Sequence, residues 1–169
     1  MNQLRLFFDI ETACNPDACA LMPEPKAPGN LKDPEKIALA IEEKKREALE
    51  MAALDADYGK ILSIGYATSP TGPVTVRLSG ELYYAEPVTI NNQPNVPEFY
   101  RDEKDLLREF WDVFKACNGY CVGYNVLGFD LPYLMGRSLA LCMPVRLVPN
   151  LAKDRTAPGT DVMMSLYNF

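Results

Sequence analysis

Residues 4–12 read LRLFFDIET, an apolar run that ends in two acidic residues. Residues 4–10 are almost continuously apolar, which is typical of a strand buried in the centre of a sheet. Asp9 and Glu11 are two residues apart, so their side chains project from the same face of that strand. Neighbouring carboxylates repel each other unless a cation lies between them, and hard oxygen ligands favour Mg²⁺ or Mn²⁺. Alternatively, both acids are simply exposed at the end of a strand, and residues 4–12 alone do not decide between the two interpretations.

Outward from this strand, the chain alternates further strands and helices. Residues 13–32 contain four prolines and are expected to form a loop. Asp33 and Pro34 are typical of a helix start, and that helix should run to about Leu54. The later elements expected are strands at 61–67, 75–79 and 121–124, a helix from about 102 to 118, and a helix from 130 to about 141. This order indicates an α/β fold with a mixed sheet, in one domain over 1–169 with a helical insertion at about 31–57.

A second cluster of polar residues lies far downstream, in the stretch GYNVLGFDLPY at 123–133. Asn125 follows a short strand, and Asp130 comes five residues later at a helix start. Locally, Asn125 can be read as a turn residue beside Gly128, and Asp130 as a helix N-cap. These local roles do not explain why Phe129 and Tyr133 accompany them.

The composition excludes several classes of active site. The chain has no histidine, which rules out serine–histidine triads and histidine-ligated zinc. Its net charge of −6 is unlike that of a basic DNA-binding module. The five cysteines form no CxxC pair and are expected to be reduced thiols. With neither a signal pattern nor a membrane-spanning run, a soluble cytoplasmic protein without membrane contact is expected.

Together, the two clusters resemble the motifs of a known superfamily. The stretch 9–12, DIET, resembles the first motif of the DnaQ-like (DEDD) 3′→5′ exonucleases. The stretch 124–133 resembles their second motif, in the form used by the proofreading domains of family-B DNA polymerases and by related bacterial and phage exonucleases. The resemblance covers essentially the whole chain. It implies a ribonuclease H-like fold, a mixed sheet flanked by helices.

The resemblance also implies a set of metal ligands. Asp9 would bridge two divalent cations, Mg²⁺ or Mn²⁺. Glu11 would complete the site of the ion that activates the attacking water, and Asp130 would hold the second ion. Two such ions stabilise the entering and leaving oxygens of an in-line displacement, and they need no histidine ligand.

The implied substrate is the 3′ end of single-stranded DNA. Thr12 would contact the terminal nucleotide, and Asn125 and Phe129 would position that nucleotide or the scissile phosphate. Such domains act in proofreading or repair, so a polymerase or another replication or repair protein is the expected partner.

One feature of the superfamily is missing from these 169 residues. Its third motif, Tyr-x-x-x-Asp or His-x-x-x-x-Asp on a late helix, supplies a fourth carboxylate. After Asp130 the only aspartates are Asp154 and Asp161, and neither lies in such a motif. The superfamily has an aspartate resembling Asp161 that is not a metal ligand. We therefore expect a chain that lacks the C-terminal helices of the fold and has weak or no nuclease activity.

Two other functions remain open on the sequence alone. The chain could act on RNA, because two motifs do not reveal contacts to a 2′-hydroxyl. It could also be a non-catalytic ribonuclease H-like binding module, which the missing motif favours and the three retained carboxylates oppose. Metal titration separates an enzyme remnant from a binding module, because only an enzyme remnant should bind Mn²⁺ through Asp9, Glu11 and Asp130.

Overall fold

The computed structural model describes residues 4–79, 88–90, 93–95, 98–100, 102–152 and 158–167. The chain forms two compact units. One contains Met1–Glu11 and Ile61–Phe169, and the other contains Thr12–Lys60. The helical insertion expected at about 31–57 lies inside the second unit.

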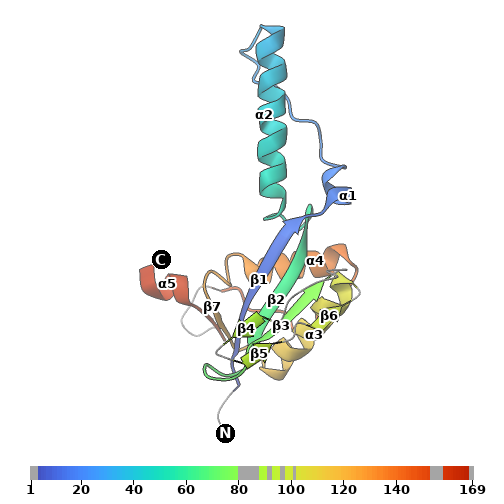
Figure 1. Ribbon diagram of the computed structural model, residues 1–169. Coiled ribbons are helices and arrows are strands. Elements are labelled where there is room, and N and C mark those ends of the chain that lie inside the picture. The colour runs from blue at the N-terminus through green and yellow to red at the C-terminus, as the bar shows by residue number, and fades with distance from the viewer. Residues whose placement is uncertain are drawn as a thin grey trace. The chain divides into compact units, whose positions relative to one another are not determined.

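Within the described residues, six strands form a mixed sheet in the order β6-β3-β2-β1-β7-β8 (Figure 1). These strands are β1 (Leu6–Cys14), β2 (Gly59–Ala67), β3 (Thr75–Ser79), β6 (Glu98–Tyr100), β7 (Cys121–Gly123) and β8 (Gly159–Asp161). β1, β7 and β8 run parallel, β2 and β3 are antiparallel, and β3 and β6 are parallel. β4 (Val88–Ile90) and β5 (Gln93–Asn95) form a separate antiparallel pair. The expected α/β fold with a mixed sheet is confirmed.

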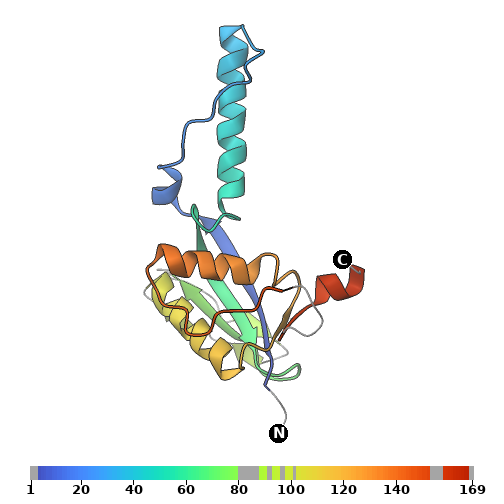
Figure 2. The same ribbon diagram turned by 180° about the vertical axis from the view of Figure 1, so that it is seen from behind.

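Two helices cover one face of this sheet, as the opposite views in Figures 1 and 2 show. α3 spans Glu103–Ala116 and α4 spans Asp130–Ala140, while the short α5 (Val162–Tyr167) follows β8. Aromatic rings of α3 fill the space beneath the sheet, and the ring centroids of Phe8 and Phe110 are 5.0 Å apart. The buried indole of Trp111 donates a hydrogen bond to Ser138 of α4 at 2.8 Å. The core therefore ties β1, α3 and α4 together.

β1 is central, but only one of its faces is buried. Leu6, Phe8 and Ile10 are buried against the helices, whereas Asp9 and Glu11 are exposed on the other face. The expectation of a strand buried throughout is therefore wrong, because both covering helices lie on the same side of the sheet. The expectation that the two acids share a face is confirmed.

The second unit is a helical segment with a long lead-in. α1 (Pro16–Cys19) interrupts the loop expected at 13–32 because Asn15 caps it, accepting a hydrogen bond from the backbone N–H of Asp17. α2 (Pro34–Ala52) begins at the expected cap, where Asp33 accepts from the N–H of Glu35 at 3.0 Å. Of the residues in α2, only Ala52 is buried.

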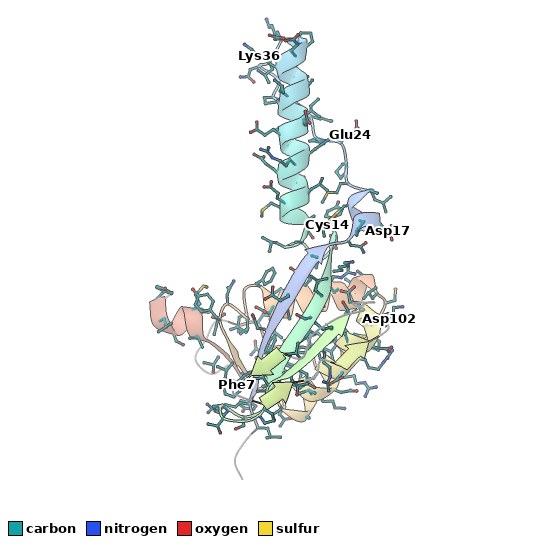
Figure 3. The ribbon with its side chains drawn as sticks, in the orientation of Figure 1. Phe7, Cys14, Asp17, Glu24, Lys36 and Asp102 are labelled. Atoms are coloured by element: carbon teal, nitrogen blue, oxygen red, sulfur yellow. A yellow bond between two sulfur atoms is a disulfide. The ribbon has the colours of Figure 1, made fainter. Side chains whose placement is uncertain are left out.

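Polar contacts hold the lead-in along α2. Lys45 pairs with Glu24, labelled in Figure 3, at 3.3 Å, and Lys44 donates to the carbonyl of Lys26 at 2.9 Å. Cys14 and Cys19 are joined by a disulfide, so the expectation of reduced thiols is wrong for this pair. No helix among the described residues is long and apolar enough to cross a membrane.

We expect Phe110→Ala to lower the free energy of unfolding by about 3–5 kcal/mol, because it empties a fully buried ring site. Leu39→Ala is the matched control, since Leu39 is 66% exposed on α2. Its effect should stay within about 0.5 kcal/mol. Urea denaturation measures both, and equal losses in the two variants would contradict the assigned core.

Candidate active site

The pairing of β1 with β7 brings the two sequence clusters together. Their parallel register aligns Leu6 with Cys121 and Phe7 with Val122. Gly123 follows in this register beside Phe8, and a Cβ there would lie 3.1 Å from the Phe8 carbonyl oxygen and collide with Val126. Glycine at this position lets β7 lie directly beside the strand that carries Asp9, and the turn follows Gly123, the last residue of β7.

The turn itself is closed by backbone hydrogen bonds. Asn125 adopts a φ of 58°, a left-handed conformation that asparagine tolerates better than most residues. Its carbonyl accepts from the N–H groups of Gly128 at 3.0 Å and Phe129 at 2.9 Å. A Cβ at Gly128 would collide with the side-chain oxygen of Asn125. The turn role predicted for Asn125 beside Gly128 is thus confirmed.

Asp161, at the end of β8, accepts hydrogen bonds from this turn. One carboxylate oxygen accepts from the N–H of Asn125 at 2.9 Å, and the other accepts from the N–H of Leu127 at 3.1 Å. The first oxygen also accepts from the N–H of Met163 at 3.1 Å. Asp161 is 5% exposed and engages three backbone donors.

Asp130 is the first residue of α4, and its carboxylate is buried although Asp130 does not cap the helix. The N-cap residue is Phe129, so the interpretation of Asp130 as a cap is wrong. Burial and, after it, the negative charge of Asp9 raise the pKa of the Asp130 carboxyl from 3.8 to about 6. Hydrogen bonding from the backbone N–H groups of Asp130 and Ile10 offsets part of this effect. Asp130 therefore lies against β1, close enough to Asp9 for their charges to repel.

This donor set suits a hard divalent cation in part. Asp9 and Asp130 offer oxygen ligands of like charge, and a cation between them would relieve their repulsion. Glu11 lies on the same face of β1 as Asp9. Among the described residues, however, no group of three or more acidic, cysteine or histidine side chains is close enough to hold a metal ion. The structure thus brings Asp9 and Asp130 together, whereas Glu11 is not gathered with them.

The residues expected to contact substrate lie close in sequence to these carboxylates. Asn125 and Phe129 are partly exposed in the turn, and the Phe129 ring packs against Tyr133 with centroids 5.4 Å apart. Thr12 directly follows Glu11 in β1 and is also partly exposed. Their roles toward a nucleotide stay predictions.

Sequence reasoning missed an ion pair that holds α4 in place. Arg137 donates two hydrogen bonds to Glu103 of α3, at 2.8 and 2.7 Å, and both side chains are largely buried. Glu103 also accepts from the N–H of Ile61 in β2 at 2.9 Å. A basic residue within an otherwise apolar helix face was the available signal, but its partner is 34 residues away in the sequence.

Comparisons with known proteins point to one family. The family described as "DNA polymerase family B, exonuclease domain" matches residues 4–146. The DNA polymerase delta catalytic subunit of Plasmodium falciparum (isolate K1 / Thailand) is 29% identical over an alignment of 122 residues that covers 63% of this chain and 11% of that protein. The family B DNA polymerase of the archaeon Pyrobaculum calidifontis superposes with a TM-score of 0.53 at 20% identity, over 100% of this chain and 16% of that one. This likeness confirms the ribonuclease H-like fold, and the chain spans only a small part of either relative.

The raised pKa of Asp130 predicts a pH-dependent cost to stability. The folded chain holds this proton up to about pH 6, above the ordinary value of 3.8, so stability falls as the pH rises through that window. Asp130→Asn keeps an accepting oxygen and removes the charge. We expect the variant to be more stable than the wild type by about 1–3 kcal/mol at about pH 7.5 without metal, with little difference near pH 4. Urea denaturation in chelator tests this, and a variant no more stable at the higher pH would contradict it.

Proposed function

Because this chain belongs to the family of exonuclease domains of family B DNA polymerases, we propose that it is a two-metal-ion 3′→5′ exonuclease domain for single-stranded DNA. The family supports a nuclease of 3′→5′ polarity. The single observation that supports the site is the placement of Asp130 against β1 beside Asp9, which unites the two motifs. The use of two metal ions, the single-stranded DNA substrate and the level of activity are all part of this proposal.

In this proposal the chain's carboxylates hold the ions, Mg²⁺ or Mn²⁺. Asp9 would contribute to both ion sites, Glu11 would hold the ion that activates the attacking water, and Asp130 would hold the other. Bound ions of this kind polarise the phosphate and lower the pKa of water. Glu11 is exposed and has room to adjust its rotamer toward Asp9, because both side chains leave the same face of β1.

The substrate end would be held by the residues that surround these carboxylates. Thr12 contacts the terminal nucleotide, and Asn125 and Phe129 position that nucleotide or its phosphate. Phe129 offers a partly exposed ring at the first turn of α4, and rings in such places stack on unpaired bases. A base can reach the ring only if it is unpaired, which favours a single strand.

We further propose that this 169-residue chain has weak or no activity by itself. Its family uses four carboxylates, and this chain offers three. Asp161 is a poor substitute for the fourth because its oxygens already accept three backbone hydrogen bonds. Without the fourth ligand, the ion at Glu11 is bound less tightly and the attacking water is not oriented.

The proposed partners follow from the relatives. Both matched proteins are DNA polymerases, and this chain corresponds to 11% of one and 16% of the other. We propose that the domain works in the cytoplasm beside a polymerase, in proofreading or repair. Analytical ultracentrifugation with the polymerases of the same organism tests this, and the absence of any complex at micromolar concentrations would contradict it.

Metal titration is the first test of the site. We expect the wild-type chain to bind Mn²⁺, and Asp9→Asn and Asp130→Asn each to weaken that affinity by at least about tenfold. Glu43→Gln is the matched control, because it removes one exposed acid from α2. Calorimetry measures all four proteins. Equal Mn²⁺ affinity in the wild type and Asp9→Asn would contradict the proposed metal site and favour a non-catalytic binding module.

Degradation of labelled oligonucleotides tests the activity. With Mg²⁺ and 5′-labelled single strands, we expect the chain to release little or no product, and any product should shorten from the 3′ end. Parallel DNA and RNA substrates decide the sugar preference. Rapid digestion that Asp9→Asn abolishes would show that three carboxylates suffice, which contradicts the expected weakness. Digestion of RNA alone would overturn the choice of DNA.

A further inference from the structure

We propose that Asp161 is a positioning residue, which fixes the turn at 124–129 so that Asp130 is held against Asp9. This inference rests on the proposed function, in which Asp9 and Asp130 must lie together to bind metal ions. It concerns a residue that is not itself a ligand.

Asp161 is the last residue of β8, at the end of the strand that neighbours β7. β8 pairs with β7 in parallel, and the register sets Gly123 beside Asp161. Gly123 is the last residue of β7 before the turn. The carboxylate of Asp161 therefore reaches the turn from the neighbouring strand end, although 31 residues separate it from Asp130 in the sequence.

Backbone hydrogen bonds join the carboxylate of Asp161 to the turn. Both oxygens of Asp161 accept from the turn, one from Asn125 and the other from Leu127. Asn125 is the residue with the left-handed φ of 58°, which costs energy unless the surroundings hold it. A buried carboxylate that accepts backbone N–H groups makes strong, charge-assisted hydrogen bonds. Asp161 thus fixes the strained residue of the turn at its N–H group.

Two further backbone hydrogen bonds join the turn to the start of α4. The carbonyl of Val126 accepts from the N–H of Leu131 at 2.9 Å, and the carbonyl of Asn125 accepts from the N–H of Phe129. These two bonds flank Asp130 on both sides. A shift of the turn therefore moves the first residue of α4, and with it the buried carboxylate that faces β1.

Three variants separate positioning from simple stability. Asp161→Ala removes all three accepted hydrogen bonds. Asp161→Asn keeps one oxygen for Asn125 and Met163 but presents an amide NH₂ toward the N–H of Leu127. Ile64→Ala empties a fully buried site in β2, which β1 separates from β7 in the sheet, so it is the control for general destabilisation.

Amide hydrogen exchange of the metal-free chain is the first measurement. In Asp161→Ala we expect exchange at Asn125, Leu127 and Leu131 to accelerate by at least about tenfold beyond the change at Cys117, whose N–H bonds to Val113 at the end of α3. Asp161→Asn should affect Leu127 most. In Ile64→Ala, the amide exchange rates in the turn should change no more than the exchange rate at Cys117. Unchanged exchange at Leu131 in Asp161→Ala would overturn the inference.

Mn²⁺ affinity is the second measurement, made where every variant is folded. We expect Asp161→Ala to lower affinity by about 10–100-fold, as for other residues that orient a ligand, with Asp161→Asn intermediate and Ile64→Ala close to the wild type. Affinity in Asp161→Ala equal to that of the wild type would overturn the positioning role. If the wild-type chain itself fails to bind Mn²⁺, the proposed function fails, and exchange at Leu131 alone then decides whether Asp161 positions α4.

Discussion

Parallel pairing between β1 and β7 is the constraint on which the site depends. The register places Gly123 next to Phe8, where any side chain would collide with the strand or with Val126. The chain turns away two residues later, through Asn125 with a left-handed backbone. α4 then starts five residues later, with its first carboxylate facing β1. Residues more than a hundred positions apart meet because two strand ends lie side by side.

The energetic character of the site follows from that meeting. Burial and, after it, the negative charge of Asp9 raise the pKa of Asp130, so the ionised carboxylate is unfavourable at this position. The fold compensates through the core beneath β1 and through the ion pair of Arg137 with Glu103, which ties α4 to α3. A site that is electrostatically strained without a cation is typical of functional carboxylates rather than of structural ones.

Much of the fold could be predicted from the sequence, because local patterns determine it. The cap at Asp33, the apolar periodicity of α3 and the alternation in β3 identify elements that the structure confirms. The short strands β6 and β8 escaped prediction because they lie at the two edges of the described sheet, where a strand needs no apolar run. The one-sided burial of β1 also escaped, since its apolar run does not reveal on which side the helices pack.

Part of the candidate site could also be predicted, because local sequence patterns mark some of its residues. Asp9 and Asp130 stood out through their motifs, and the structure places them together. The backbone hydrogen bonds of Asp161 and the steric demand at Gly123 could not be read from the chain, because both arise only when β7 lies between two neighbours. Glu11 shares the face of Asp9 as predicted, but its part in a metal site stays a prediction.

The most direct test of the central claim is paramagnetic broadening of amide resonances by substoichiometric Mn²⁺. We expect the signals of residues 9–11 and 129–131 to broaden first and together, because one ion would lie between Asp9 and Asp130. Broadening centred on other acids, such as the exposed Asp105 and Asp112 of α3 or the charged face of α2, with residues 9–11 and 129–131 left sharp, would contradict it.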